Sequence, residues 1–253
     1  MGMIRQIFDR KGFPVLASIF LLLFIAETKR ELRRKKGEKF KRIITNTLVS
    51  LPAFSLLRFL FLPLVIRLAR QNTRWKIGIS YLYPFPVFIR NMIVFLLLDY
   101  SNYLWHRLNH KSKFLWRFHL VHHTDVDLDL STAIRFHFGE MIGSLFYRGA
   151  AVLLTGASPG LVLYYEIVFE AATQFHHSNW KLPLNLERNL NKLIVTPRMH
   201  GIHHSNIQKE TDSNYSVIFS GWDKLHQTLK LNKAQSSIVI GVPSYSDAKE
   251  LTA

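Results

Sequence analysis

The residues most able to do chemistry in this chain are its histidines. All 12 of them lie between His106 and His226, within a sequence of 253 residues. Most fall into three short patterns, HRLNH, HLVHH and HGIHH, whose members are three or four residues apart. On an α-helix this spacing puts the side chains of a pattern on one face, so we expect the imidazoles of each pattern to converge on one volume. The eight residues concerned are His106, His110, His119, His122, His123, His200, His203 and His204.

Converging neutral imidazoles are what a transition-metal site requires, because imidazole suits iron, copper, zinc and nickel. Eight of them exceed the three or four protein ligands of one zinc ion, so the count implies two metal ions. The chain contains no cysteine, which excludes thiolate-bound zinc and iron–sulfur clusters. No H-E-x-x-H motif supplies the general base of a zinc hydrolase. Two iron ions in such a site can use O₂ to attack an unactivated C–H bond.

The elements that must position these histidines are apolar and flanked by basic sequence. With 33 Lys and Arg against 17 Asp and Glu, the formal net charge is +16. Nine basic residues lie in the stretch 27–42, directly between two apolar runs. This placement is typical of a cytoplasmic segment beside a membrane, and it argues against a nucleic-acid-binding surface.

Four apolar regions are candidates for entering a bilayer, which takes about 20 residues to cross. We interpret region 12–26 as a membrane anchor that is not cleaved off. Regions 43–66 and 79–105 are each predicted to cross the membrane once. Region 141–175 is broken by Gly156 and Pro159 and predicts a helical hairpin that enters and returns. The fold expected is an all-α, multi-pass integral-membrane helical bundle, with a cytoplasmic helical cap that carries the histidines. The basic connection 67–78 is the one feature that the positive-inside rule does not explain.

The histidine patterns also carry a resemblance. The stretches DYSNYLWHRLNH, WRFHLVHHTD, TAIRFH, QFHHSNW, VTPRMHGIHHS, ETDSNYS and WDKLHQT resemble the fatty acid hydroxylase / sterol desaturase superfamily of membrane di-iron enzymes. The resemblance covers more than half of the chain. It divides the chain into a membrane anchor region with a basic loop (1–98), a hydroxylase-like di-iron domain that includes the hairpin 141–175 (99–245), and a C-terminal tail (246–253).

The resemblance implies a di-iron centre, O₂ as co-substrate, and the eight histidines above as metal ligands. It adds His177 as a ninth ligand, with His176 and His137 as additional or supporting residues. His226 stands where the family usually has phenylalanine, so we expect it to be structural. Among the carboxylates that could hold a ligating imidazole in place, Asp99 and Glu170 are preferred, because a carboxylate within an apolar run is costly and tends to be functional.

Other carboxylates have plainer interpretations. Asp125, Glu140, Asp212 and Asp223 are also available to hold a ligating imidazole. For Asp125, Asp127 and Asp129 the alternative expectation is that they are solvated charges of a turn. Glu166 and Glu170 are alternatively partners of Arg135 or Arg148 inside the hairpin.

The function expected is O₂-dependent hydroxylation or desaturation of a membrane lipid, either fatty acyl, sterol or related, in lipid biosynthesis. No dinucleotide fingerprint occurs, so a separate cytochrome, ferredoxin or reductase should deliver the electrons. The alternative is a membrane metal-binding or metal-transport protein, which would place polar ligands at the bilayer midplane. The sequence does not separate hydroxylase from desaturase, and it names neither the lipid nor the oligomeric state.

Overall fold

The computed structural model describes residues 8–245, and this part of the chain is all helical, without a β-strand. The predicted all-α class is therefore confirmed. The only strand-like pairings in it are isolated bridges, such as the one between Glu31 and Trp180. The predicted C-terminal tail, 246–253, lies outside the described residues.

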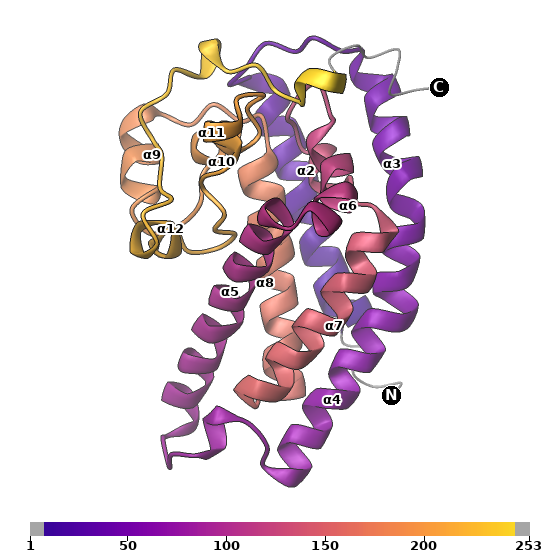
Figure 1. The fold of residues 1–253 in the computed structure, drawn as a ribbon, viewed down its shortest axis with the longest axis vertical. Coiled ribbons are helices and arrows are strands. Elements are labelled where there is room, and N and C mark those ends of the chain that lie inside the picture. The colour runs from indigo at the N-terminus through magenta and orange to yellow at the C-terminus, as the bar shows by residue number, and fades with distance from the viewer. Residues whose placement is uncertain (1–7, 246–253) are drawn as a thin grey trace.

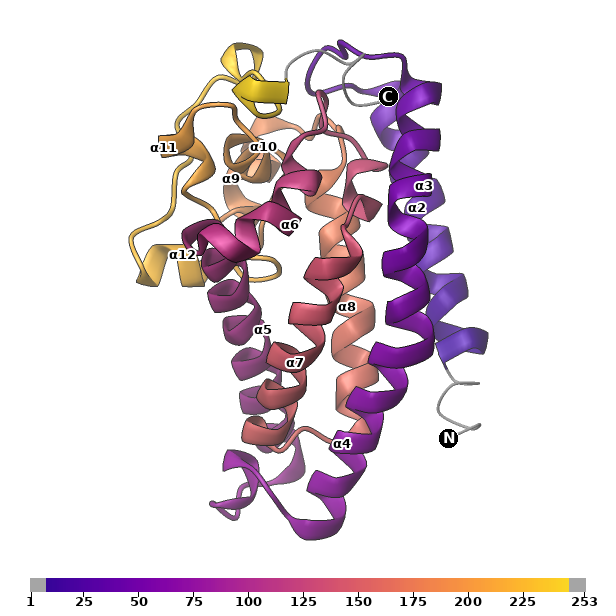
Figure 2. The same cartoon turned by 45° about the vertical axis from the view of Figure 1, so that its right-hand side comes forward.

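Long helices run side by side along the long axis of the molecule, and short helices gather at one end (Figures 1 and 2). A π-helical turn, η2 (Leu57–Phe61), joins α3 and α4 into one nearly continuous rod. The long helices are α2 (Phe13–Lys29), α3 (Lys39–Leu56), α4 (Leu62–Trp75), α5 (Val87–Lys111), α7 (Phe138–Thr155) and α8 (Pro159–His177). The short helices are α6 (Lys113–His123), α9 (Leu184–Leu190), α10 (Pro197–His203), α11 (Gln208–Thr211) and α12 (Gly221–Leu225).

Two helical segments, Lys39–Tyr81 and Val87–Lys111, are long and apolar enough to cross a membrane. Only 33% and 28% of their most apolar windows are buried inside the protein, whereas a core helix of a water-soluble protein would be mostly buried. Large side chains such as Phe88, 75% exposed, lie on their outer faces, as expected for contact with lipid. The sequence suggested four membrane regions. Neither α2 nor the α7–α8 pair meets the same criterion, so their entry into a bilayer stays a prediction.

The predicted break at 155–160 is a tight turn between α7 and α8. Gly156 ends α7 with φ of +76°, a left-handed conformation that glycine adopts without a steric penalty. Ser158 then caps α8 by accepting a hydrogen bond from the Leu161 amide at 3.3 Å, and Pro159 takes the first position of the helix. The two helices therefore form a hairpin, as the glycine and proline indicated.

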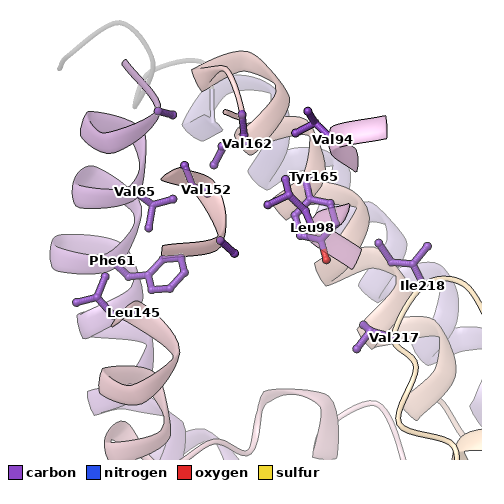
Figure 3. Packing of buried hydrophobic residues seen from close by; sticks show 13 residues of the cluster. Phe61, Val65, Val94, Leu98, Leu145, Val152, Val162, Tyr165, Val217 and Ile218 are labelled. Atoms are coloured by element: carbon purple, nitrogen blue, oxygen red, sulfur yellow. The ribbon is translucent and has the colours of Figure 1, made fainter. Parts of the chain in front are cut away.

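The apolar core ties the long helices together below the short ones. Figure 3 shows Phe61 and Val65 from η2 and α4 beside Val152 from α7, and Leu98 from α5 beside Tyr165 from α8. All five belong to one buried cluster. Val217 and Ile218, from the segment before α12, belong to the same cluster. The short helices are thus anchored on the core of the long ones, which fixes their position relative to it.

The basic segment between α2 and α3 lies at the same end of the molecule as the short helices (Figure 1). The Leu32 amide donates to the Asn179 carbonyl at 2.8 Å. Arg33 Nη1 donates to the Gln235 side chain at 2.7 Å and to the Pro197 carbonyl at 3.2 Å. The two parts of the chain therefore share one side of any membrane that the long helices cross.

The aspartates after α6 are buried, so the expectation that they are solvated turn charges is wrong. Asp125 and Asp129 are 3% and 1% exposed. Arg42, at the start of α3, donates to Asp125 at 2.7 and 2.8 Å and to Asp129 at 2.8 Å. Burial alone would raise the pKa of Asp125, but the hydrogen bonds and charge of Arg42 hold it below its ordinary value. This ion-pair cluster joins the start of α3 to the loop that follows HLVHH.

Candidate metal centre

Nine buried or half-buried imidazoles from four helices converge at the end of the molecule where the short helices lie. Within each of two groups, the potential ligand atoms are all within 4.8 Å of one another, an arrangement that could hold a metal ion. The first group contains His106, His110, His119, His123 and His203, and the second contains His122, His177, His200 and His204. These are the nine histidines singled out from the sequence as ligands.

The structure divides each HxxHH triplet between the two groups. On α6, His119 and His123 face the first group and His122 faces the second. On α10 and the residue after it, His203 faces the first group and His200 and His204 face the second. The expectation that each triplet converges on one volume is therefore wrong. Residues i and i+4 share a direction, whereas i+3 is rotated far enough to reach the neighbouring group.

Backbone carbonyls fix the ring orientation of ligand candidates in both groups. In the second group, His122 Nδ1 lies 3.0 Å from the Arg135 carbonyl and His177 Nδ1 lies 2.8 Å from the Thr173 carbonyl. In the first group, the Tyr215 carbonyl is 2.8 Å from His106 Nδ1 and the Ser213 carbonyl is 2.7 Å from His203 Nδ1. A carbonyl oxygen only accepts, so each Nδ1 donates its proton. In the neutral rings, Nε2 then carries a free lone pair.

In the second group the lone pairs of His122 and His177 face each other, and the Nε2 atoms of His200 and His204 lie beside them. His177 Nε2 is 3.0 Å from the Nε2 atoms of both His122 and His200, and His200 Nε2 is 3.1 Å from that of His204. Protonation does not relieve the repulsion, because burial and the neighbouring His177 lower the pKa of His122 well below 6.5. Ligand nitrogens about 2.1 Å from a metal ion and at right angles to each other are about 3.0 Å apart. A bound cation therefore explains this spacing.

The first group also contains ring nitrogens that are free to bind a metal ion. The Nε2 atoms of His110, His119, His123 and His203 are buried and have no hydrogen-bond partner within the described chain. Buried polar atoms without partners are rare in proteins and mark an ion or a functional site. The residues of both groups thus fit a pair of metal ions of the kind that imidazole binds.

A carboxylate holds one of these rings, but it is neither of the two preferred from the sequence. His119 Nδ1 lies 3.0 Å from Glu140 Oε1, and Glu140 is 5% exposed. Asp99 instead accepts hydrogen bonds from Trp222 Nε1 at 2.7 Å and the Phe219 amide at 3.1 Å, so it holds the segment before α12 in place. Among the described residues, Glu170 contacts no ligand candidate through a hydrogen bond. Glu140 was available in RFHFGE, yet nothing local in the sequence distinguished it.

The other histidines lie outside both groups. His137 Nδ1 accepts from the Gly139 amide at 3.0 Å and caps α7, so the expectation of an additional ligand there is not supported. His176 is buried with its ring centroid 4.1 Å from that of His200. His226 stacks on Tyr103 and shares a 2.9 Å hydrogen bond with the Tyr100 hydroxyl, in agreement with a structural role.

A largely apolar cavity lies beside the histidines, between α3, α5, α7 and α8. It is lined by Phe54, Met141 and Phe169, among others. Phe54 is 40% exposed, so the cavity reaches the outer face of α3. A second hollow, lined by histidines of both groups, shares Trp105 and Phe136 with the first. The two hollows together form a path from the apolar surface to the histidines, lined largely by apolar side chains as ligand sites are.

The comparison with protein families agrees with this geometry. The model of the fatty acid hydroxylase family matches residues 91–228, which is more than half of the chain and contains every member of both histidine groups. The chain belongs to the fatty acid hydroxylase family. The resemblance seen in the sequence motifs is thereby confirmed.

Curated relatives of this fatty acid hydroxylase family protein act on lipids, as their names state. Ornithine lipid hydroxylase OlsE of Rhizobium tropici is 29% identical over 64% of this chain and 49% of its own length. Human alkylglycerol monooxygenase is 28% identical over 54% of this chain and 29% of its own. A cholesterol 25-hydroxylase-like protein of Danio rerio is 28% identical over 86% of this chain and 90% of its own. The chain spans half or less of the first two relatives, and no solved structure matches it significantly.

Proposed function

We propose that this chain is a membrane-bound, O₂-dependent di-iron oxidoreductase that hydroxylates a lipid. The observation that carries the proposal is the pair of histidine groups, whose free lone pairs converge beside an apolar cavity. Membership in the fatty acid hydroxylase family supports the reaction class. The names of the relatives, which are hydroxylases and a monooxygenase, favour hydroxylation over desaturation for this chain.

The membrane setting follows from the two apolar segments and their exposed outer faces. We place the histidines on the cytoplasmic side, because the segment with nine basic residues at 27–42 contacts the same end of the molecule as the short helices. The basic residues at the far end of α4 remain the feature that argues against this orientation.

In this proposal, His106, His110, His119, His123 and His203 hold one iron, and His122, His177, His200 and His204 hold the other. When bound, the two irons supply the reduction of O₂ and the oxidation of a C–H bond. The protein contributes rigidity, because the carbonyls of Arg135, Thr173, Tyr215 and Ser213 and the carboxylate of Glu140 fix the tautomers of the rings that they contact.

The cavity contributes substrate positioning. A lipid that enters beside Phe54 passes between Trp105, Phe136 and Phe169 to reach the hollow below the histidines. Apolar walls exclude water from the reacting carbon. The electrons come from a separate cytochrome, ferredoxin or reductase, since the sequence carries no dinucleotide-binding fingerprint.

A metal-transport function is the second candidate, and the site argues against it. A transporter binds its ion at the bilayer midplane, where discontinuous helices meet. Here the histidines lie at one end of the long helices, among α6 and α10, and backbone carbonyls hold rings of both groups in fixed orientations. Fixed ligands of this kind suit a resident ion.

Lipid analysis of cells that carry the active gene tests the proposed reaction. Matched cultures should express the wild-type chain or the His203→Ala variant at equal levels in the membrane. We expect a lipid with one added oxygen in the wild-type culture alone, because only that protein keeps both metal sites. A species that loses two hydrogens instead would assign a desaturase, and identical lipids in both cultures would contradict lipid oxidation altogether.

A further inference from the structure

Glu170 is a carboxyl group in the wall of the apolar cavity with which no residue of the described chain forms a hydrogen bond or an ion pair. It lies on α8 and lines the cavity together with Phe54, Leu57 and Phe169. Within residues 8–245 it has neither a hydrogen-bond partner nor a salt-bridge partner. The nearest guanidinium is already engaged, since Arg148 Nη2 is 2.5 Å from Glu166 Oε1. Of the two hairpin pairings considered from the sequence, Glu166 with Arg148 is confirmed, whereas Glu170 is unpaired.

Arg148 is held in this position by more than its ion pair. Its guanidinium lies over the rings of Phe61 and Phe169, with centroid distances of 4.9 and 4.7 Å. Two carboxyl groups, Glu166 and Glu170, thus share the neighbourhood of one cation, whose ion pair is with Glu166. The carboxyl group of Glu170 therefore lines the cavity without a hydrogen-bond donor from the described chain.

A hydroxyl group without a hydrogen-bond partner lines the same path. Thr173 is 5% exposed and lines both hollows, and its hydroxyl Oγ1 is buried without a partner. Glu170, Thr173 and His177 are spaced i, i+3 and i+7, so they share one face of α8. Seven residues of an α-helix rise about 10 Å. Glu170 therefore lies about two turns from the nearest ligand candidate on its helix, along the path toward the histidines.

We infer that Glu170 binds a hydrogen-bond donor of the lipid, either a hydroxyl or a protonated amine, and so sets which carbon reaches the histidines. The inference rests on the proposed function, in which this cavity takes the lipid substrate. The substrate class is then a lipid that carries such a donor group, rather than a plain hydrocarbon chain. Thr173 offers the same group a second hydrogen bond.

Equilibrium binding of simple radiolabelled probes tests this without turnover. The probes are hexadecan-1-ol, 1-hexadecylamine and hexadecane, and the proteins are the full chain in mild detergent as wild type, Glu170→Leu and Glu170→Gln. Ser144→Ala, which removes another polar group from the same cavity wall, is the matched control. The ratio of each polar probe's Kd to that of hexadecane is compared between proteins, because partition into the detergent then cancels.

We expect Glu170→Leu to weaken binding of a polar probe about tenfold or more, as loss of a hydrogen bond to a charged group does. Binding of hexadecane should be unchanged, which also shows that the variant is folded, and Ser144→Ala should keep the wild-type ratio. If Glu170→Leu weakens hexadecan-1-ol alone, the donor is a hydroxyl, and Glu170→Gln should keep this probe because the amide oxygen still accepts. If Glu170→Leu weakens 1-hexadecylamine alone, the donor is an amine, and Glu170→Gln should lose this probe as completely because the amide has no charge.

Equal ratios in wild type and Glu170→Leu for both polar probes would overturn the inference, as would the absence of saturable binding of any probe. The result is independent of the metal. A protein without iron that still shows Glu170-dependent binding would contradict the proposed reaction and support this site. A protein that oxidises a lipid, but whose Kd ratios are equal in wild type and Glu170→Leu, would support the proposed reaction and contradict this site.

Discussion

Replacing His122 or His203 by alanine is expected to lower lipid oxidation by about 100-fold or more. The two residues belong to different histidine groups, so each change removes a ligand from a different metal ion. Loss of a residue that merely holds a ligand typically costs about 10–100-fold, and loss of the ligand itself should cost at least as much. Turnover is measured with membranes that contain equal amounts of each protein and the lipid identified by lipid analysis.

His226→Phe is the matched control for these two variants. His226 is also an aromatic neighbour of Tyr100 and Tyr103, but it lies outside both groups, and phenylalanine preserves the stacking. Substantial activity should remain in this variant, and all three proteins should insert into the membrane to the same extent, because the apolar helices dominate insertion. Full turnover by His122→Ala and His203→Ala would show that the metal lies elsewhere.

Stability of the metal-free protein is expected to fall steeply as the pH drops below about 6.5. Burial, and then neighbouring histidines, lower the pKa of five ligand candidates well below 6.5: His122, His123, His200, His203 and His204. In the unfolded chain the same rings protonate near 6.5. Below that pH the unfolded state binds more protons than the folded state, so the free energy of unfolding decreases.

Each of these histidines contributes at most about 1.4 kcal/mol per pH unit below this point. Together they should lower the thermal midpoint by roughly 10 °C between pH 6.5 and 5.5. The measurement is thermal unfolding of chelator-treated protein in detergent across this range. His122→Gln removes one titrating ring and should make the dependence shallower. A midpoint that is the same at pH 7.5 and 5.5 would contradict the burial of neutral imidazoles described above.

The sequence predicts the local features of the fold and the site well, because they depend on neighbours along the chain. Gly156 and Pro159 mark the hairpin turn, since one tolerates a positive φ and the other fits the first turn of a helix. The i, i+3 and i+4 spacing predicts that the histidines of a pattern lie close together, but not which of them share a metal group. All nine ligands expected from the spacing and the family resemblance lie in one of the two groups.

Features that depend on packing between distant segments are not predictable in the same way. His119 and Glu140 are 21 residues apart, and Arg42 and Asp125 are 83 apart, so only the folded chain brings them together. Local sequence therefore favoured the wrong carboxylate, Asp99. The division of HLVHH and HGIHH between two metal groups likewise depends on how α6 and α10 are rotated against α5 and α8.

Counting the metal in the purified protein tests the central claim most directly. The full chain should be expressed with iron supplied, purified without oxygen in mild detergent and analysed for iron and zinc by elemental mass spectrometry. Two histidine groups with converging lone pairs predict close to two irons per chain. A reproducible value of one iron or none would contradict the di-iron account.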